Sequence, residues 1–83
     1  MTTYRVVLMK PARKFIERQP YQQQERLLKA IYQLPYEGDI KPLVGQDNVY
    51  RLRVGIYRVI YSVNDDILTV VVLKAGNRGD VYR

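Results

Sequence analysis

The segment from residue 50 to residue 61 reads Tyr50-Arg-Leu-Arg-Val-Gly-Ile-Tyr-Arg-Val-Ile-Tyr61, two short β-rich runs around a Gly-Ile pair. Gly at the first central position favours a type II′ turn, which joins the antiparallel strands of a hairpin. If this pair forms the turn, Leu52 pairs with Val59 and Arg53 pairs with Arg58. The same register pairs Val54 with Tyr57, Arg51 with Ile60, and Tyr50 with Tyr61. These residues therefore predict a hairpin of fixed register, which constrains how the rest of the chain can fold.

Further strands are predicted on both sides of this hairpin. The run from Tyr4 to Met9 is β-rich and contains no breaker, and the run from Ile67 to Leu73 is apolar and of strand length. We read Asn64-Asp65 as a two-residue turn. That turn would place Leu68, Val70 and Val72 on the apolar face, whereas a loop one residue longer would place Thr69 there.

Two helices are predicted between the first strand and the hairpin. Pro11 can occupy the first turn of a helix, and Ala12, Phe15 and Ile16 keep helical spacing. Pro20 ends this short helix and can open a second one, which Pro35 stops. The apolar stripe of the second helix consists of Leu27, Leu28, Ile31 and Leu34.

The segment from Pro35 to Gly45 is predicted to be a loop, because Pro42 argues against a central strand. The resulting order is one strand, a two-helix hairpin and a three-stranded antiparallel meander that completes a twisted sheet. We therefore expect a single α+β domain over residues 1–83, with the helices on one face of the sheet.

Composition excludes several kinds of chemistry. The chain has no Cys and no His, so it has no disulfide, no thiolate nucleophile and no Ser-His-Asp machinery. Asp65-Asp66 is the one carboxylate pair, and a predicted turn explains it. We therefore expect neither a metal nor another cofactor.

The charge balance indicates the kind of partner. There are 14 Lys and Arg residues against 8 Asp and Glu, a net charge of +6, which favours anionic partners such as nucleic acid or an acidic protein. No apolar run approaches the length of a membrane span, and the N-terminus lacks the features of a signal peptide. We expect a soluble cytoplasmic protein.

Three arginines share one surface of the predicted hairpin. Strand alternation places Arg51, Arg53 and Arg58 on the face opposite the apolar residues. Like charges directly opposed across strands are destabilising by about 0.2–1 kcal/mol, so the cluster suggests a ligand outside the fold. Guanidinium groups bind phosphate oxygens bidentately. The alternative is a solvated basic face, or ion pairs to distant carboxylates such as Glu17 or Glu25.

The C-terminal segment contains a fourth arginine and a late tyrosine. Gly76 and Gly79 make it rich in turns, and it follows the last strand directly. It could therefore fold back and bring Arg78 and Tyr82 beside the arginine face.

Two blocks of the sequence closely resemble the RelE/ParE superfamily of type II toxin–antitoxin toxins. They are the hairpin from Tyr50 to Tyr61 and the ending Leu73-Lys-Ala-Gly-Asn-Arg-Gly-Asp-Val-Tyr82. The segments Lys10–Ile16 and Ile40–Gly45 also fit, so the resemblance covers nearly the whole chain. The ending favours the RelE branch over the ParE branch, which implies the RelE-like microbial RNase fold.

The resemblance also implies a function and its partners. RelE-type toxins are ribosome-dependent mRNA endonucleases that cut the codon exposed in the ribosomal A site. A partner antitoxin wraps and silences the toxin. We therefore expect mRNA on the ribosome as the substrate, and a cognate RelB-like antitoxin that forms a hetero-oligomer with this chain.

The functional positions of the family can be carried over residue by residue. They are two basic residues on the second strand, an arginine on the third, an arginine after the last strand and a late tyrosine. The matching residues here are Arg51, Arg53, Arg58, Arg78 and Tyr82. The well-studied branch has lysines at positions 51 and 53. Arginine retains phosphate binding but stays protonated, which argues against proton transfer at position 51.

Two other readings remain open. A ParE-like toxin would inhibit DNA gyrase by protein binding and would not need Tyr82 or the full arginine set. A non-catalytic RNA-binding module would show salt-sensitive binding and cause no growth arrest.

Overall fold

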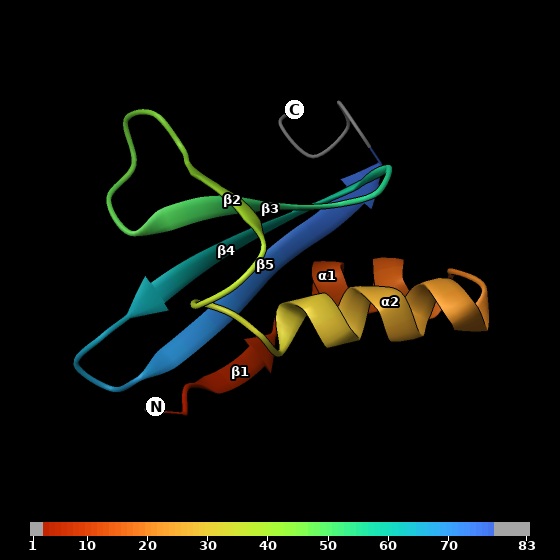
Figure 1. The fold of residues 1–83 in the computed structure, drawn as a ribbon, viewed down its shortest axis with the longest axis horizontal. Coiled ribbons are helices and arrows are strands. Elements are labelled where there is room, and N and C mark those ends of the chain that lie inside the picture. The colour runs from red at the N-terminus through yellow and green to blue at the C-terminus, as the bar shows by residue number, and fades with distance from the viewer. Residues whose placement is uncertain (1–2, 78–83) are drawn as a thin grey trace.

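The computed structural model describes residues 3–77, so Arg78 and Tyr82 lie outside the described residues. One sheet contains all the described strands, in the order β1-β5-β4-β3-β2 (Figure 1). Strand β1 is parallel to β5, and every other neighbouring pair is antiparallel. The elements are β1 (Arg5–Leu8), α1 (Lys10–Glu17), α2 (Tyr21–Ile31), β2 (Asp39–Pro42), β3 (Val49–Val54), β4 (Tyr57–Asn64) and β5 (Thr69–Asn77).

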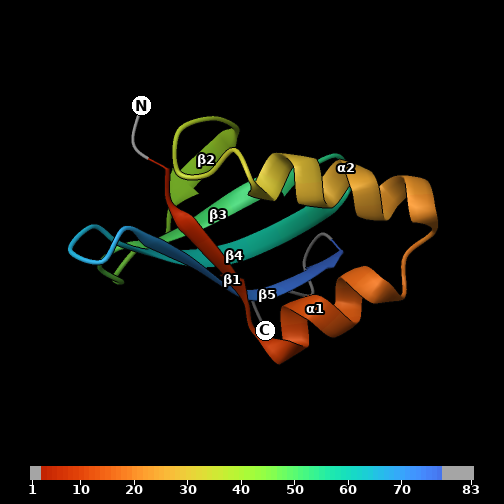
Figure 2. The same cartoon turned by 90° about the horizontal axis from the view of Figure 1, so that it is seen from below.

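Both helices lie on the same side of the sheet, which confirms the expected α+β layering (Figures 1 and 2). Pro11 sits in the first turn of α1 and Pro20 precedes the first residue of α2, as their missing N–H groups favour. The core between the layers contains Ala12, Ile16, Leu27, Ile31, Leu52, Val59, Tyr61, Val70 and Val72. Neither helix in residues 3–77 has the length and hydrophobicity that a membrane span requires.

The β3–β4 hairpin has the predicted register. Leu52 pairs with Val59, and Arg53 pairs with Arg58. Gly55 has a φ of +59°, whereas Ile56 is not among the residues with positive φ. This combination is the one that a type II′ turn requires.

The turn between β4 and β5 is longer than predicted. Asn64 pairs with Thr69, so the connection spans residues 65–68 in place of the predicted Asn64-Asp65 turn. The Asn64 side-chain oxygen accepts hydrogen bonds from the backbone N–H groups of Asp66 (3.0 Å) and Ile67 (3.3 Å), which closes the loop. Leu68, predicted on the apolar face, belongs to this loop and is 40% exposed. Val70 and Val72 do face the core.

The predicted loop from Pro35 to Gly45 contains a short strand, so the meander has four strands where three were expected. Strand β2 pairs with β3 at the edge of the sheet. Pro42 is its last residue, and an edge strand tolerates proline because one row of its N–H groups has no ladder partner. Pro42 does argue against a central strand, as predicted, but it does not exclude an edge strand.

Three tyrosines of the hairpin pack on the helix-facing side of the sheet. The Tyr50 and Tyr61 rings stack with centroids 5.5 Å apart. The Tyr57 ring meets Phe15 edge-on at 5.8 Å, and its hydroxyl donates to the Gln19 side-chain oxygen at 3.2 Å. These contacts make all three residues structural.

Stability at alkaline pH tests the packing of Tyr61. Burial, together with the neighbouring Tyr50 phenol, raises the pKa of Tyr61 to about 12. A free tyrosine has a pKa of about 10, so the unfolded chain loses this proton first and the free energy of unfolding falls between about pH 10 and pH 12. We expect Tyr61→Phe to reduce that fall, measured by urea denaturation at pH 8 and pH 11. The exposed Tyr21→Phe variant is the control, and equal pH dependence in both variants would contradict this packing.

Candidate functional site

The face of the sheet opposite the helices carries a cluster of positive charge, which we call the basic face. Strand register places its charged residues in two neighbouring rows. The first row contains Lys41, Arg51, Ile60 and Lys74, and the second contains Asp39, Arg53, Arg58 and Gly76. The basic face therefore brings together three of the predicted site residues.

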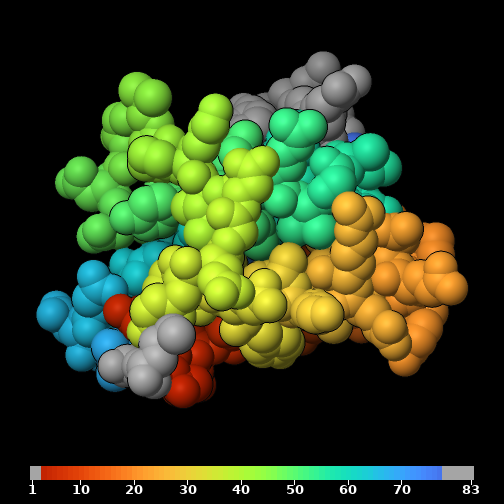
Figure 3. Space-filling model, in the orientation of Figure 1, coloured from red at the N-terminus to blue at the C-terminus, as the bar shows by residue number. Residues whose placement is uncertain are grey.

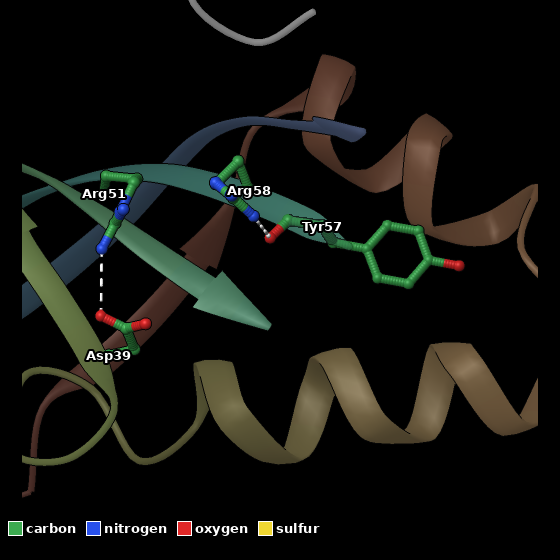
Figure 4. A network of polar contacts seen from close by, with 4 residues as sticks. All are labelled: Asp39, Arg51, Tyr57 and Arg58. Atoms are coloured by element: carbon green, nitrogen blue, oxygen red, sulfur yellow. Dashed lines mark hydrogen bonds and ion pairs between the residues drawn. The ribbon is translucent and has the colours of Figure 1, made fainter. Parts of the chain in front are cut away.

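Arg53 and Arg58 are directly opposed across the hairpin, as predicted. Arg53 is exposed, whereas Arg58 is 8% exposed and its Nη1 donates to the Tyr57 carbonyl oxygen at 3.1 Å. Figure 4 shows this bond, with the Tyr57 ring projecting away from the arginines. The backbone carbonyl thus fixes the Arg58 guanidinium without neutralising its charge.

Arg51 is held by a carboxylate that the sequence prediction missed. Its Nη2 donates to Asp39 Oδ1 at 3.0 Å, across the β2–β3 pair (Figure 4). The Arg51 side chain is 12% exposed and that of Asp39 is 55% exposed. Arg51 Nε is buried and has no hydrogen-bond partner among residues 3–77. The ion pair therefore orients a largely covered arginine.

Neither predicted carboxylate takes this role. Glu17 Oε1 lies 3.9 Å from Arg13 Nε on α1, and within residues 3–77 no ion pair joins Glu25 to an arginine. Asp39 is the only acidic residue in the described strands. It was missed because β2 was expected to be a loop.

An open depression of about 340 Å³ lies at the tip of the hairpin on this side. Its lining consists of Arg53, Gly55, Ile56, Arg58 and Asn77. The tip lies at the surface next to α2, in blue-green beside the orange helix in Figure 3. The volume is at the lower end of the range for ligand pockets, and the two arginines give it an affinity for anions.

The tyrosines in the described strands do not contribute to the basic face. Tyr50, Tyr57 and Tyr61 belong to the helix-facing side. Tyr4 precedes β1, and its hydroxyl donates to Asp65 at 2.6 Å, which raises the pKa of Tyr4 to about 12. Tyr82, the tyrosine predicted at the site, lies like Arg78 outside the described residues.

The Asp39–Arg51 ion pair can be tested by stability. Because Asp39 is more than half exposed, we expect Asp39→Asn to lower the free energy of unfolding by no more than about 1 kcal/mol. The measurement is urea denaturation of the wild type, Asp39→Asn, Arg51→Gln and the double variant. Most of the loss should vanish in the Arg51→Gln background, and exposed Asp47→Asn should have no effect. Additive losses would show that the pair does not act as a unit.

Comparison with known proteins places this chain in a family. A model of the ParE toxin of the type II toxin–antitoxin system parDE matches residues 6–82. The toxin RelG of Mycobacterium tuberculosis is 34% identical over 67 residues, which cover 70% of this chain and 76% of that protein.

Solved structures agree with this result. The fold matches a chain of the crystal structure of an archaeal RelE–RelB complex from Pyrococcus horikoshii, with a TM-score of 0.80 and 36% identity over 95% of this chain and 99% of that one. It also matches a chain of the RelB–RelE complex from Methanococcus jannaschii, with a TM-score of 0.74 and 28% identity over 92% and 94%. The chain therefore belongs to the RelE/ParE superfamily of type II toxins, and within it to the RelE-like branch.

Proposed function

We propose that this toxin is a metal-independent endoribonuclease that cuts mRNA in the ribosomal A site. The observation that carries the proposal is the opposition of Arg53 and Arg58 beside an open depression on the basic face. No carboxylate of the described residues forms an ion pair with either arginine. Two guanidinium groups in this position suit the oxygens of one phosphodiester.

RNA can be cut by its own 2′-hydroxyl group. The 2′-oxygen attacks the adjacent phosphorus, the bond from phosphorus to the 5′-oxygen breaks, and the products are a 2′,3′-cyclic phosphate and a 5′-hydroxyl. The protein must orient the nucleotide, accept the 2′-hydroxyl proton, stabilise the added negative charge and return a proton to the leaving oxygen.

The arginines divide these tasks. Arg58, held by the Tyr57 carbonyl, is pre-positioned to stabilise charge on the phosphate, and Arg78 shares this role by its match to the family. Exposed Arg53 and the oriented Arg51 bind substrate phosphates. Arg51 does not transfer protons, because a guanidinium remains protonated at physiological pH.

The partners are proposed from the relatives. The RelE chains from Pyrococcus horikoshii and Methanococcus jannaschii were solved in complexes with RelB. We propose a cognate RelB-like antitoxin and a toxin–antitoxin hetero-oligomer in the cytoplasm. Arg13, Lys14 and Arg18 are exposed on and just after α1 and suit acidic residues of such a partner.

A second candidate follows from the family model itself, which describes a ParE toxin. A toxin of that kind would inhibit DNA gyrase by protein binding and leave RNA intact. Its activity would depend little on the opposed arginines, so loss of those arginines separates the two functions.

The decisive test is cleavage of mRNA on programmed ribosomes, read by primer extension, beside a gyrase supercoiling assay. We expect Arg53→Gln to lower the cleavage rate by roughly a hundredfold, because it removes a charge that binds the reacting phosphate. Lys29→Gln removes one positive charge from the exposed side of α2, and this variant should cleave mRNA at the wild-type rate. Naked RNA should be cut only weakly. Intact mRNA together with blocked supercoiling would establish the gyrase alternative.

Tyr82→Phe tests the acid–base role that we propose for Tyr82 as general base or as the group that orients the 2′-hydroxyl. Loss of a general acid–base group costs about 10²–10⁴ in rate, so single-turnover cleavage on the ribosome should fall within that range. Binding of a short RNA should change little. Cleavage at the wild-type rate would remove tyrosine acid–base chemistry from the account.

A further inference from the structure

An irregularity in β5 brings an additional cation to the basic face. Val72 pairs with Tyr61 and Lys74 pairs with Ile60, so Leu73 is an extra residue at this point of the ladder. Such a bulge reverses the side-chain alternation beyond it. Without it, Lys74 would continue the series of Val70 and Val72 into the core. The bulge turns the lysine to the opposite face, and Ala75 pairs with Val59 and packs against the core instead.

The position of Lys74 relates it to the arginine pair. It lies on the strand next to Arg58 and two residues before Gly76, the partner of Arg58, so it is a diagonal neighbour of Arg58. The Cα atoms of diagonal neighbours are about 7–8 Å apart, a separation that long side chains such as Lys and Arg can bridge, so both can reach one nucleotide chain. Ile60, which is buried, separates Lys74 from Arg51 in the same row.

Lys74 has no evident role in stabilising the fold. Its side chain is exposed, and no hydrogen bond or ion pair joins that side chain to another of residues 3–77. Its positive charge is repelled by the neighbouring Arg58. In the same row, Asp39 offsets the charge of Arg51, whereas Lys41 at the far end is exposed and, like Lys74, forms no ion pair with another of residues 3–77. Lys74 is the cation that lies beside Arg58, across the β4–β5 pair.

We propose that Lys74 is a further substrate-binding residue of this toxin, and that it holds a backbone phosphate next to the one that Arg53 and Arg58 bind. This inference rests on the proposed ribonuclease function. An ammonium on a flexible stem can follow a phosphate whose position varies between substrates, whereas Arg58 is fixed by its carbonyl contact. The bulge thus adds a cation that lets the basic face bind two successive phosphates in place of one.

The test compares Lys74→Gln, Lys74→Arg and the control Lys29→Gln in two assays. The first is fluorescence anisotropy with a labelled oligoribonucleotide that has 2′-deoxyribose at the cut position, measured over a range of salt concentrations. The second is single-turnover cleavage on programmed ribosomes. Lys29 is also an exposed lysine but lies on α2, so Lys29→Gln matches the change in charge.

We expect Lys74→Gln to bind the oligonucleotide about fivefold more weakly, as for the loss of one exposed charge pair. The slope of the logarithm of the association constant against the logarithm of the salt concentration should become shallower by about 0.7, the value for one phosphate contact to a single strand. Lys74→Arg should restore most of the affinity and the slope. If Lys74 had only a structural role, its substitution would lower the melting temperature of the protein and leave the salt slope unchanged.

The remaining outcomes separate the two proposals. If the wild type cleaves on the ribosome while Lys74→Gln has the same affinity and salt slope as Lys29→Gln, the role of Lys74 is overturned and the ribonuclease function stands. If the wild type does not cleave, the proposed function is overturned and the role of Lys74 with it.

Discussion

The site depends on the fixed register of the β3–β4 hairpin, in which two like-charged residues are held opposite each other. Repulsion between Arg53 and Arg58 costs about 0.2–1 kcal/mol. On the other side of the same strands, Leu52 and Val59 are almost completely buried, and each contributes about 1.5–3 kcal/mol through burial. Core packing therefore outweighs the repulsion, and a slip of one residue would expose this apolar pair. The fold supplies the energy that concentrates positive charge on one face of the sheet.

Two features change the charge at the edges of the basic face: the edge strand β2 and the bulge in β5. Strand β2 adds one carboxylate, Asp39, which orients Arg51 and reduces the charge at one end of the basic face. The bulge in β5 adds Lys74 at the other side. The opposed pair Arg53 and Arg58, next to the depression at the hairpin tip, is thus flanked by the exposed Lys41 on β2 and Lys74 on β5. A surface of this kind suits a polyanion with regularly spaced charges better than a single small anion.

Local sequence rules were sufficient for the hairpin and the two helices, because Gly55, the prolines and the apolar periodicity act over a few residues. They failed at the β4–β5 turn, which is longer than the two residues predicted, and where pairing depends on distant residues. Strand β2 was not predicted because it contains Pro42, and only the sheet shows that this proline lies on an edge strand. The role of Asp39, which belongs to the same strand, was therefore not predicted either. The only local sign of the bulge at Leu73 is Lys74, a charged residue that directly follows an apolar run. This sign alone does not predict a bulge. The roles of Arg78 and Tyr82 remain predictions from the family resemblance.

The central claim is that the basic face binds the nucleotide chain at the opposed arginines. NMR titration of ¹⁵N-labelled toxin with an oligoribonucleotide that has 2′-deoxyribose at the cut position tests this claim most directly. The account predicts that the side-chain signals of Arg53 and Arg58 and the backbone amides of residues 53–58 shift with added nucleotide, while the amides of α1 and α2 do not. Shifts confined to the helices, or no shift of the arginine signals at saturation, would contradict it.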